Sequence, residues 1–165
     1  MASKFQARAP YFLLMLAVLV LDRWTKALIL SKLDLNDAIT VIDGFFDITY
    51  VQNTGVAFSM FSSIDSPVKS VLLSLFTAAA AVMVVIYSLR SPSQDRLLQA
   101  GLGLILGGAL GNLYDRLTYG YVVDFLEFYV GSYRWPTFNV ADSAISTGVF
   151  LLAVEILRHE APSRA

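Results

Sequence analysis

The sequence has no cysteine and only one histidine, His159, in 165 residues. Without cysteine, disulfide bonds, thiolate nucleophiles and cysteine-based metal sites are excluded. Neither a Ser-His-Asp triad nor an HExxH zinc site can be assembled without placing His159 at its centre. We therefore expect no metal ion and no cofactor.

Charged residues are also few. They make up 15% of the chain, against 56% hydrophobic residues, and the formal net charge is -1. The hydrophobic share exceeds the roughly 45–50% that is usual in soluble domains. A nucleic-acid binder needs a basic stripe, whereas the twelve lysines and arginines are scattered. The composition predicts an integral membrane protein in contact with lipid, without a nucleic-acid partner.

Four hydrophobic segments are long enough to cross a bilayer, whose core of about 30 Å needs about 20 helical residues. They cover roughly 11–30, 68–89, 97–115 and 139–157. No internal repeat divides the chain, so residues 1–165 are expected to form one membrane domain of four transmembrane helices. The apolar start of the first segment resembles a secretory signal, but Asp22, Arg23 and Lys26 follow it where a cleavage site would need small residues. We expect this segment to be retained.

Basic residues indicate how the chain is oriented. The positive-inside rule places loops rich in lysine and arginine in the cytoplasm. The basic residues that flank the four segments on one side are Lys4, Arg8, Arg90, Arg96, Arg158 and Arg164. Both termini are therefore expected in the cytoplasm, and the loops at about 31–66 and 116–138 outside. The first of these loops agrees, because it holds five aspartates against Lys32 alone.

The outer loops contain signals for β-structure. Asp43-Gly44 lies between the apolar pairs at 41–42 and 45–46, a pattern typical of a hairpin turn, and β-prone residues continue to Val51. This predicts a small β-rich region on the membrane surface. In the second outer loop, we expect the apolar stretch 122–129 to lie along the interface and Trp135-Pro136 to form a turn.

The third segment carries Gly103, Gly107 and Gly111 at four-residue spacing. Such spacing leaves bare backbone along one stripe of a helix, where a neighbouring helix can approach closely. We expect another segment to pack there.

Two aspartates, Asp124 and Asp142, stand beside hydrophobic segments, each flanked by apolar residues. An aspartate at the centre of a membrane helix costs roughly 2.5–3.5 kcal/mol, and less near the interface, so such residues usually have a function. Two close carboxylates can share one proton and activate water. Because Asp142 follows Asp124 by eighteen positions, they meet only if the second outer loop folds back over the fourth segment.

Other polar residues allow both a structural and a functional interpretation. Asp22 and Lys26 are four residues apart and can form an ion pair that serves only packing. The segment from Asn53 to Phe58, which contains Gly55, is either a plain turn or a place where backbone amides bind a peptide. Asn112 and Arg116 end the third segment, where the guanidinium can hold an acid, a loop carbonyl or a lipid phosphate.

Taken together, these blocks resemble a known family in their order and spacing. The family is that of the bacterial lipoprotein signal peptidases, also called signal peptidase II, and the resemblance covers roughly 20–150. The blocks are Asp22 to Lys26, Asn53 to Phe58, Gly111 to Arg116, Val122 to Phe125 and Phe138 to Ser143. The stretch from Glu127 to Arg134 matches no motif of the family.

The resemblance implies an intramembrane aspartic endopeptidase of the bacterial inner membrane, active near its outer face. Such an enzyme removes the signal peptide from diacylglyceryl-modified prolipoproteins, cutting before the lipidated cysteine. The resemblance makes Asp124 and Asp142 the catalytic pair, and we expect a monomer. The residues that it implies as substrate-binding or supporting are Asn53, Gly55, Asn112, Arg116, Asn139, Asp22 and Lys26.

Three other functions remain open from the residues alone. A small ion-coupled transporter could use the membrane aspartates, although such carriers are commonly built from repeats and this chain has none. A structural assembly protein could use its polar residues only to join helices. A serine protease could pair Lys26 with Ser59 or Ser143.

Overall fold

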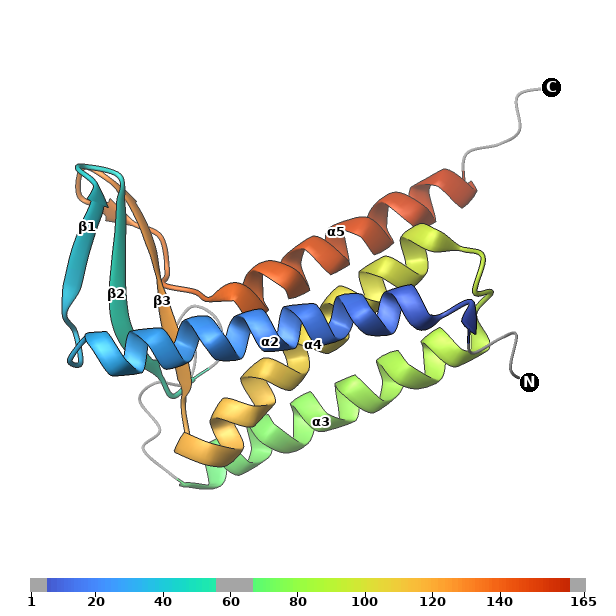
Figure 1. Cartoon of the computed structure of the whole chain (residues 1–165), viewed down its shortest axis with the longest axis horizontal. Coiled ribbons are helices and arrows are strands. Elements are labelled where there is room, and N and C mark those ends of the chain that lie inside the picture. Colours follow the sequence, from blue (N-terminus) through green and yellow to red (C-terminus); the bar gives the residue numbers. More distant parts are fainter. Residues whose placement is uncertain (1–5, 56–66, 161–165) are drawn as a thin grey trace.

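The computed structural model describes residues 6–55 and 67–160. Its four long helices are α2 (Ala9–Lys32), α3 (Pro67–Arg90), α4 (Arg96–Tyr119) and α5 (Val140–Glu160). They form a bundle, with a small antiparallel sheet standing at one end of it (Figure 1). The expectation of a mainly helical protein with a small β-rich region is confirmed.

Three of the described helices, α3, α4 and α5, are long and apolar enough to cross a membrane. The fourth, α2, has the same length of 24 residues as α3 and α4. Its apolar sequence is interrupted by Asp22, Arg23 and Lys26. Length and composition alone therefore identify three spans in the described part of the chain.

Helix α4 lies at the centre of the bundle and packs against α2, α3 and α5. Its glycines allow two of these contacts. A Cβ atom on Gly107 would lie 2.7 Å from the carbonyl oxygen of Met15 on α2, and one on Gly108 would collide with the carbonyl oxygen of Ala141 on α5. The expected close approach of another helix to the glycine stripe is confirmed, and α5 packs against a second glycine-containing face.

We expect Gly107→Leu to destabilise the protein by at least about 1–3 kcal/mol, because overpacking a tight contact forces backbone to move. The new side chain would meet the backbone of Met15 and the side chain of Val18. Thermal unfolding in detergent measures the effect. Ala79→Leu, at an exposed position of α3, is the matched control; equal unfolding midpoints for the two variants would contradict the packing argument.

The sheet contains β1 (Ala38–Ile42), β2 (Phe46–Asn53), β3 (Val122–Val130) and β4 (Tyr133–Arg134), in the order β1-β2-β3-β4. The expected hairpin is present, and Gly44 adopts a φ of 73° in its turn. The stretch 122–129, which we expect to lie along the interface, forms β3. It pairs with β2, whose residues lie 69 to 82 positions earlier in the chain, and local sequence patterns carry no signal for such a distant partner.

A small hydrophobic core joins the sheet to α2. It consists of Ile29 from the helix, Tyr50 from β2, and Val123 and Phe125 from β3. Because successive side chains of a strand point to opposite faces, anchoring Val123 and Phe125 against α2 directs Asp124 to the other face. The core thus determines where this carboxylate lies.

Candidate active site

Asp124 and Asp142 line the same cleft, which has a volume of about 1180 Å³. The cleft lies between the sheet and the facing ends of α4 and α5, and its walls come from β2, β3, α4, α5 and the segment 134–138. Asp124 is 2% exposed, whereas Asp142 is half-buried. The fold therefore brings together the two carboxylates that the sequence singled out.

Asp142 is held by the start of α5. Its backbone N–H donates to Oδ1 of Asn139 at 2.9 Å, and the backbone N–H of Asn139 donates back to Oδ2 of Asp142 at 3.3 Å. This reciprocal pair corresponds to a capping box, which satisfies backbone donors that a helix start leaves without partners. The capping of α5 thereby fixes one carboxylate of the site.

Asn139 also reaches the other carboxylate. Its Nδ2 atom donates to Oδ1 of Asp124 at 2.7 Å, and the residue is fully buried. One asparagine thus contacts Asp124 with its amide group and Asp142 with both its backbone N–H and its amide oxygen. The two aspartates share a single positioning residue.

Each carboxylate has a second amide partner. Asn53 donates from Nδ2 to Oδ2 of Asp124 at 2.9 Å, and Asn112 donates from Nδ2 to Oδ1 of Asp142 at 2.7 Å. The N–H of Gly55 donates to Oδ1 of Asn53 at 2.9 Å, which fixes the orientation of that amide. The segment around Gly55 is therefore a turn that serves the site, and its continuation at 56–58 lies outside the described residues.

Asp22 and Lys26 form a fully buried ion pair, with Nζ of Lys26 2.9 Å from Oδ2 of Asp22. Nζ also lies 2.8 Å from Oδ2 of Asp115 and donates to Oδ1 of Asn112 at 2.9 Å. Because this contact occupies the amide oxygen of Asn112, its NH₂ group is left to face Asp142. The pair is both a packing clamp and a support for the site.

Asp115 is a supporting residue that the sequence analysis did not select. It is fully buried, forms ion pairs with Arg23 and Lys26 of α2, and accepts the backbone N–H of Val123 at 3.1 Å. The last contact fixes the backbone directly before Asp124. One sequence signal could have identified Asp115: it is a carboxylate inside an apolar helix, three residues after Asn112.

Arg116 lines the cleft together with the two aspartates, and its charge attracts both of them. Burial, followed by the charge of Asp142, raises the pKa of the Asp124 carboxyl to about 7, and hydrogen bonds from Asn53 and Asn139 oppose this shift. At neutral pH a large share of Asp124 is therefore protonated.

All nine residues expected from the sequence lie in this site or in the buried network behind it.

The geometry also bears on the serine protease alternative. Lys26 is engaged by Asp22, Asp115 and Asn112, and the hydroxyl of Ser143 donates to the carbonyl oxygen of Asn139 at 2.9 Å. Ser59 lies outside the described residues.

Across 6–55 and 67–160, no group of three or more His, Cys, Asp or Glu side chains is placed to hold a metal ion.

Comparisons with known proteins identify the family of this chain. Residues 14–158 match the family model described as signal peptidase (SPase) II. The chain belongs to the signal peptidase II family. The lipoprotein signal peptidase of Geobacter sulfurreducens is 47% identical over 145 residues, 88% of this chain and 89% of the relative. That of Syntrophus aciditrophicus is 40% identical over 143 residues, 87% of this chain and 89% of the relative.

Solved structures also resemble this signal peptidase II family member. Two are described as bacterial membrane enzymes determined by the in meso method. One, at 2.3 Å resolution, has a TM-score of 0.85 and 28% identity, covering 94% of this chain and 92% of its own. The other, at 1.9 Å, has a TM-score of 0.80 and 29% identity, covering 90% and 93%. The transporter alternative finds no support in these comparisons.

Proposed function

We propose that this protein is an aspartic endopeptidase that removes the signal peptide from diacylglyceryl-modified prolipoproteins, with Asp124 and Asp142 as its catalytic pair. The observation that carries the proposal is the bridge through Asn139, which contacts both carboxylates. The names of the relatives, lipoprotein signal peptidases, supply the substrate class.

The proposed reaction needs one proton shared by the pair. Protonated Asp124 donates a hydrogen bond to the carbonyl oxygen of the scissile peptide, while ionised Asp142 takes a proton from a water molecule that attacks the carbonyl carbon. The tetrahedral intermediate then collapses, the C–N bond breaks, and the proton held by Asp142 passes to the leaving nitrogen. The burial of Asp124 supports its part as the protonated member.

The cleft has the features that such a substrate requires. Beyond Asp142 it continues along α5, past Ile145 to Thr147, into a helix apolar enough to cross a membrane. A signal peptide and the acyl chains on the modified cysteine would enter from that side. Arg116 is positioned to meet a substrate carbonyl or a lipid phosphate, because it lines the same cleft.

We infer that α2 is a fourth transmembrane helix. Its charged residues Asp22 and Lys26 are fully buried within the protein, and Arg23 pairs with Asp115, so these charges are compensated inside the bundle. Four spans would put both termini on the cytoplasmic side and the sheet at the outer face of the inner membrane. The site is assembled within one chain, which supports a monomer as the active form.

The direct test is the conversion of a diacylglyceryl-modified prolipoprotein to its shortened form by the purified protein, followed on a gel. Mass spectrometry of the product should give a chain that begins at the modified cysteine. A product that begins elsewhere, or no conversion by a folded preparation, would refute the proposed activity.

We expect the activity to fall with a midpoint near pH 7 on the alkaline side. The pKa of Asp124 is about 7, so raising the pH removes the shared proton, and kcat/KM should decline about tenfold per unit above the midpoint. Replacing Asn53 with alanine removes a hydrogen bond that lowers the pKa of Asp124. The midpoint of that variant should therefore move to higher pH; an unchanged profile would argue against Asp124 as the titrating group.

A further inference from the structure

The cleft contains a second charged pair, apart from the two aspartates and Arg116. It consists of Glu127 on β3 and Arg134 on β4, which form an ion pair at the cleft wall. This pair lies in the stretch that matched no family motif. Its place in the same cleft as the catalytic pair makes it a candidate for contact with the substrate.

The pair belongs to a cluster with an excess of negative charge. Asp47 on β2 stands beside it, with its Oδ2 atom 4.0 Å from Nη1 of Arg134, and the guanidinium of Arg134 lies 4.7 Å from the ring centre of Tyr129. The Tyr129 hydroxyl donates to Oδ1 of Asp47 at 3.3 Å. Two carboxylates therefore surround one guanidinium, which leaves a formal charge of −1. We call Asp47, Glu127 and Arg134 the rim cluster.

The rim cluster is accessible from the cleft. The side chain of Arg134 is 55% exposed and that of Glu127 is 18% exposed, whereas that of Asp47 is 9% exposed behind them. An incoming charged group would thus meet the guanidinium and the Glu127 carboxylate first. Asp47 contributes mainly through its charge.

Strand geometry sets the distance between the rim cluster and the scissile bond. Glu127 follows Asp124 by three residues on the same strand, or about 10 Å at about 3.3 Å per residue. Both line the cleft, because the strand has a bulge between them, where the N–H groups of Phe125 and Leu126 both donate to the carbonyl oxygen of Phe138. An extended substrate advances at a similar rate, so its third residue from the cut reaches the rim cluster. The sheet stands beyond the N-terminal end of α5 (Figure 1), away from the turns of α5 that line the membrane side of the cleft. The residues concerned are therefore those that follow the modified cysteine.

We propose that the rim cluster is a specificity subsite that favours a basic over an acidic side chain about three residues after the scissile bond. This inference rests on the proposed function. A substrate lysine pairs with Glu127 while Arg134 remains beside Asp47. A substrate aspartate instead competes with Glu127 for Arg134 and faces the negative excess.

The test compares three diacylglyceryl-modified prolipoprotein substrates that differ only at the second residue after the modified cysteine, which is the third residue after the scissile bond. This residue is serine, lysine or aspartate. For partly exposed charges we expect kcat/KM for the lysine substrate to exceed that for the aspartate substrate about three- to tenfold at low salt. The ratio should shrink at 0.5 M NaCl, because salt screens exposed charges.

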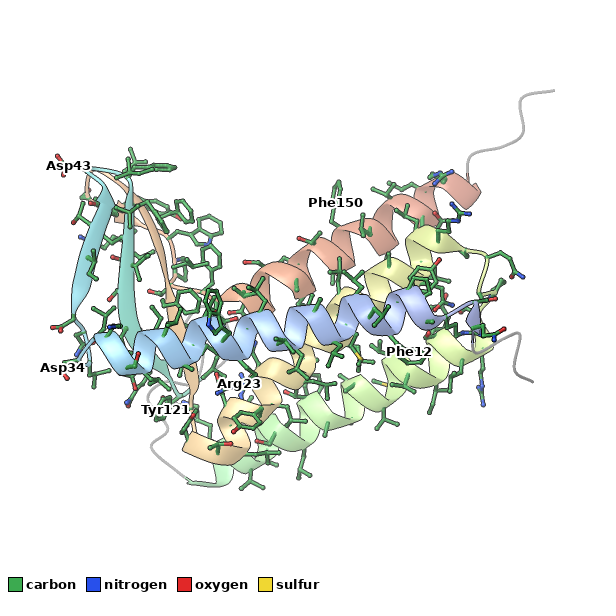
Figure 2. The ribbon with its side chains drawn as sticks, in the orientation of Figure 1. Phe12, Arg23, Asp34, Asp43, Tyr121 and Phe150 are labelled. Atoms are coloured by element: carbon green, nitrogen blue, oxygen red, sulfur yellow. The ribbon has the colours of Figure 1, made fainter. Side chains whose placement is uncertain are left out.

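Variants assign the preference to the rim cluster. Glu127→Gln should bring the ratio towards one, and Arg134→Gln should widen it, because two carboxylates then lack their cation. Asp34→Asn is the matched control, since it removes an acidic charge from an exposed position outside the cleft lining (Figure 2). Its ratio should equal that of the wild type. Circular dichroism confirms that each variant is folded.

The serine substrate separates the two proposals. If wild-type protein does not cleave it, the proposed function fails. If it is cleaved, but the lysine and aspartate substrates react equally or Glu127→Gln keeps the wild-type ratio, the subsite is refuted and the peptidase assignment stands.

Discussion

Replacing either Asp124 or Asp142 with asparagine should lower the rate of prolipoprotein cleavage at least about a thousandfold. Asparagine keeps the size of the side chain and one oxygen, but it can neither accept a proton from water nor carry the shared proton, and general acid–base catalysis contributes about 10²–10⁴-fold for a single group. The rate is measured from gel conversion of the modified precursor, with each variant checked for membrane insertion and thermal stability.

A control replacement elsewhere tests whether the loss of any aspartate charge lowers the cleavage rate. Asp37→Asn changes an aspartate in the exposed turn before β1, outside the cleft lining. It should cleave at the wild-type rate. Full activity of a folded Asp124→Asn or Asp142→Asn variant would refute the catalytic pair.

Lys26→Met should be the most destabilising single substitution in the buried network. The four charges there balance, since Asp22 and Asp115 face Arg23 and Lys26. Removing the lysine leaves an uncompensated buried carboxylate, which costs about 3–5 kcal/mol. Thermal unfolding in detergent should show a much lower midpoint, and activity should fall because Asn112 loses the contact that orients it towards the site.

A double variant makes this prediction specific to charge. Asp22→Asn combined with Lys26→Met restores neutrality, and the asparagine oxygen can still accept the backbone N–H of Ala141. We expect the double variant to unfold at a higher temperature than Lys26→Met alone. If the double variant is no more stable than Lys26→Met alone, the lost packing of the lysine chain rather than the charge imbalance accounts for the destabilisation.

The sequence predicts the helices well because their signals are local. The length of an apolar run predicts whether it forms a helix that can cross a membrane. The glycine spacing in α4 predicts that another helix packs closely against it. The sheet was only half predictable, since the β1–β2 hairpin is marked by Asp43-Gly44 whereas the pairing of β2 with β3 joins residues 69 to 82 positions apart.

The site shows the same difference between local signals, which the sequence carries, and long-range contacts, which it does not. Asp124 and Asp142 stand out because aspartate is rare beside apolar segments, and the family motifs point to their amide partners. The bridging geometry of Asn139 and the contact from Asp115 to the backbone of Val123 depend on how β3, α4 and α5 meet. No pattern within one segment encodes such a junction, which explains why Asp115 was passed over.

The long-range bond between Ala141 and Asp22 has a consequence for biosynthesis. The Ala141 N–H donates to Oδ1 of Asp22 at 3.0 Å, across 119 residues of sequence. A ribosome makes α2 before α5, so the carboxylate of Asp22 acquires this partner only after the 118 residues between them have been synthesised. The start of α5 carries Asp142 as well, and the nascent protein therefore remains without a complete site until α5 has docked. Activity would then report that α5 is in place against α2.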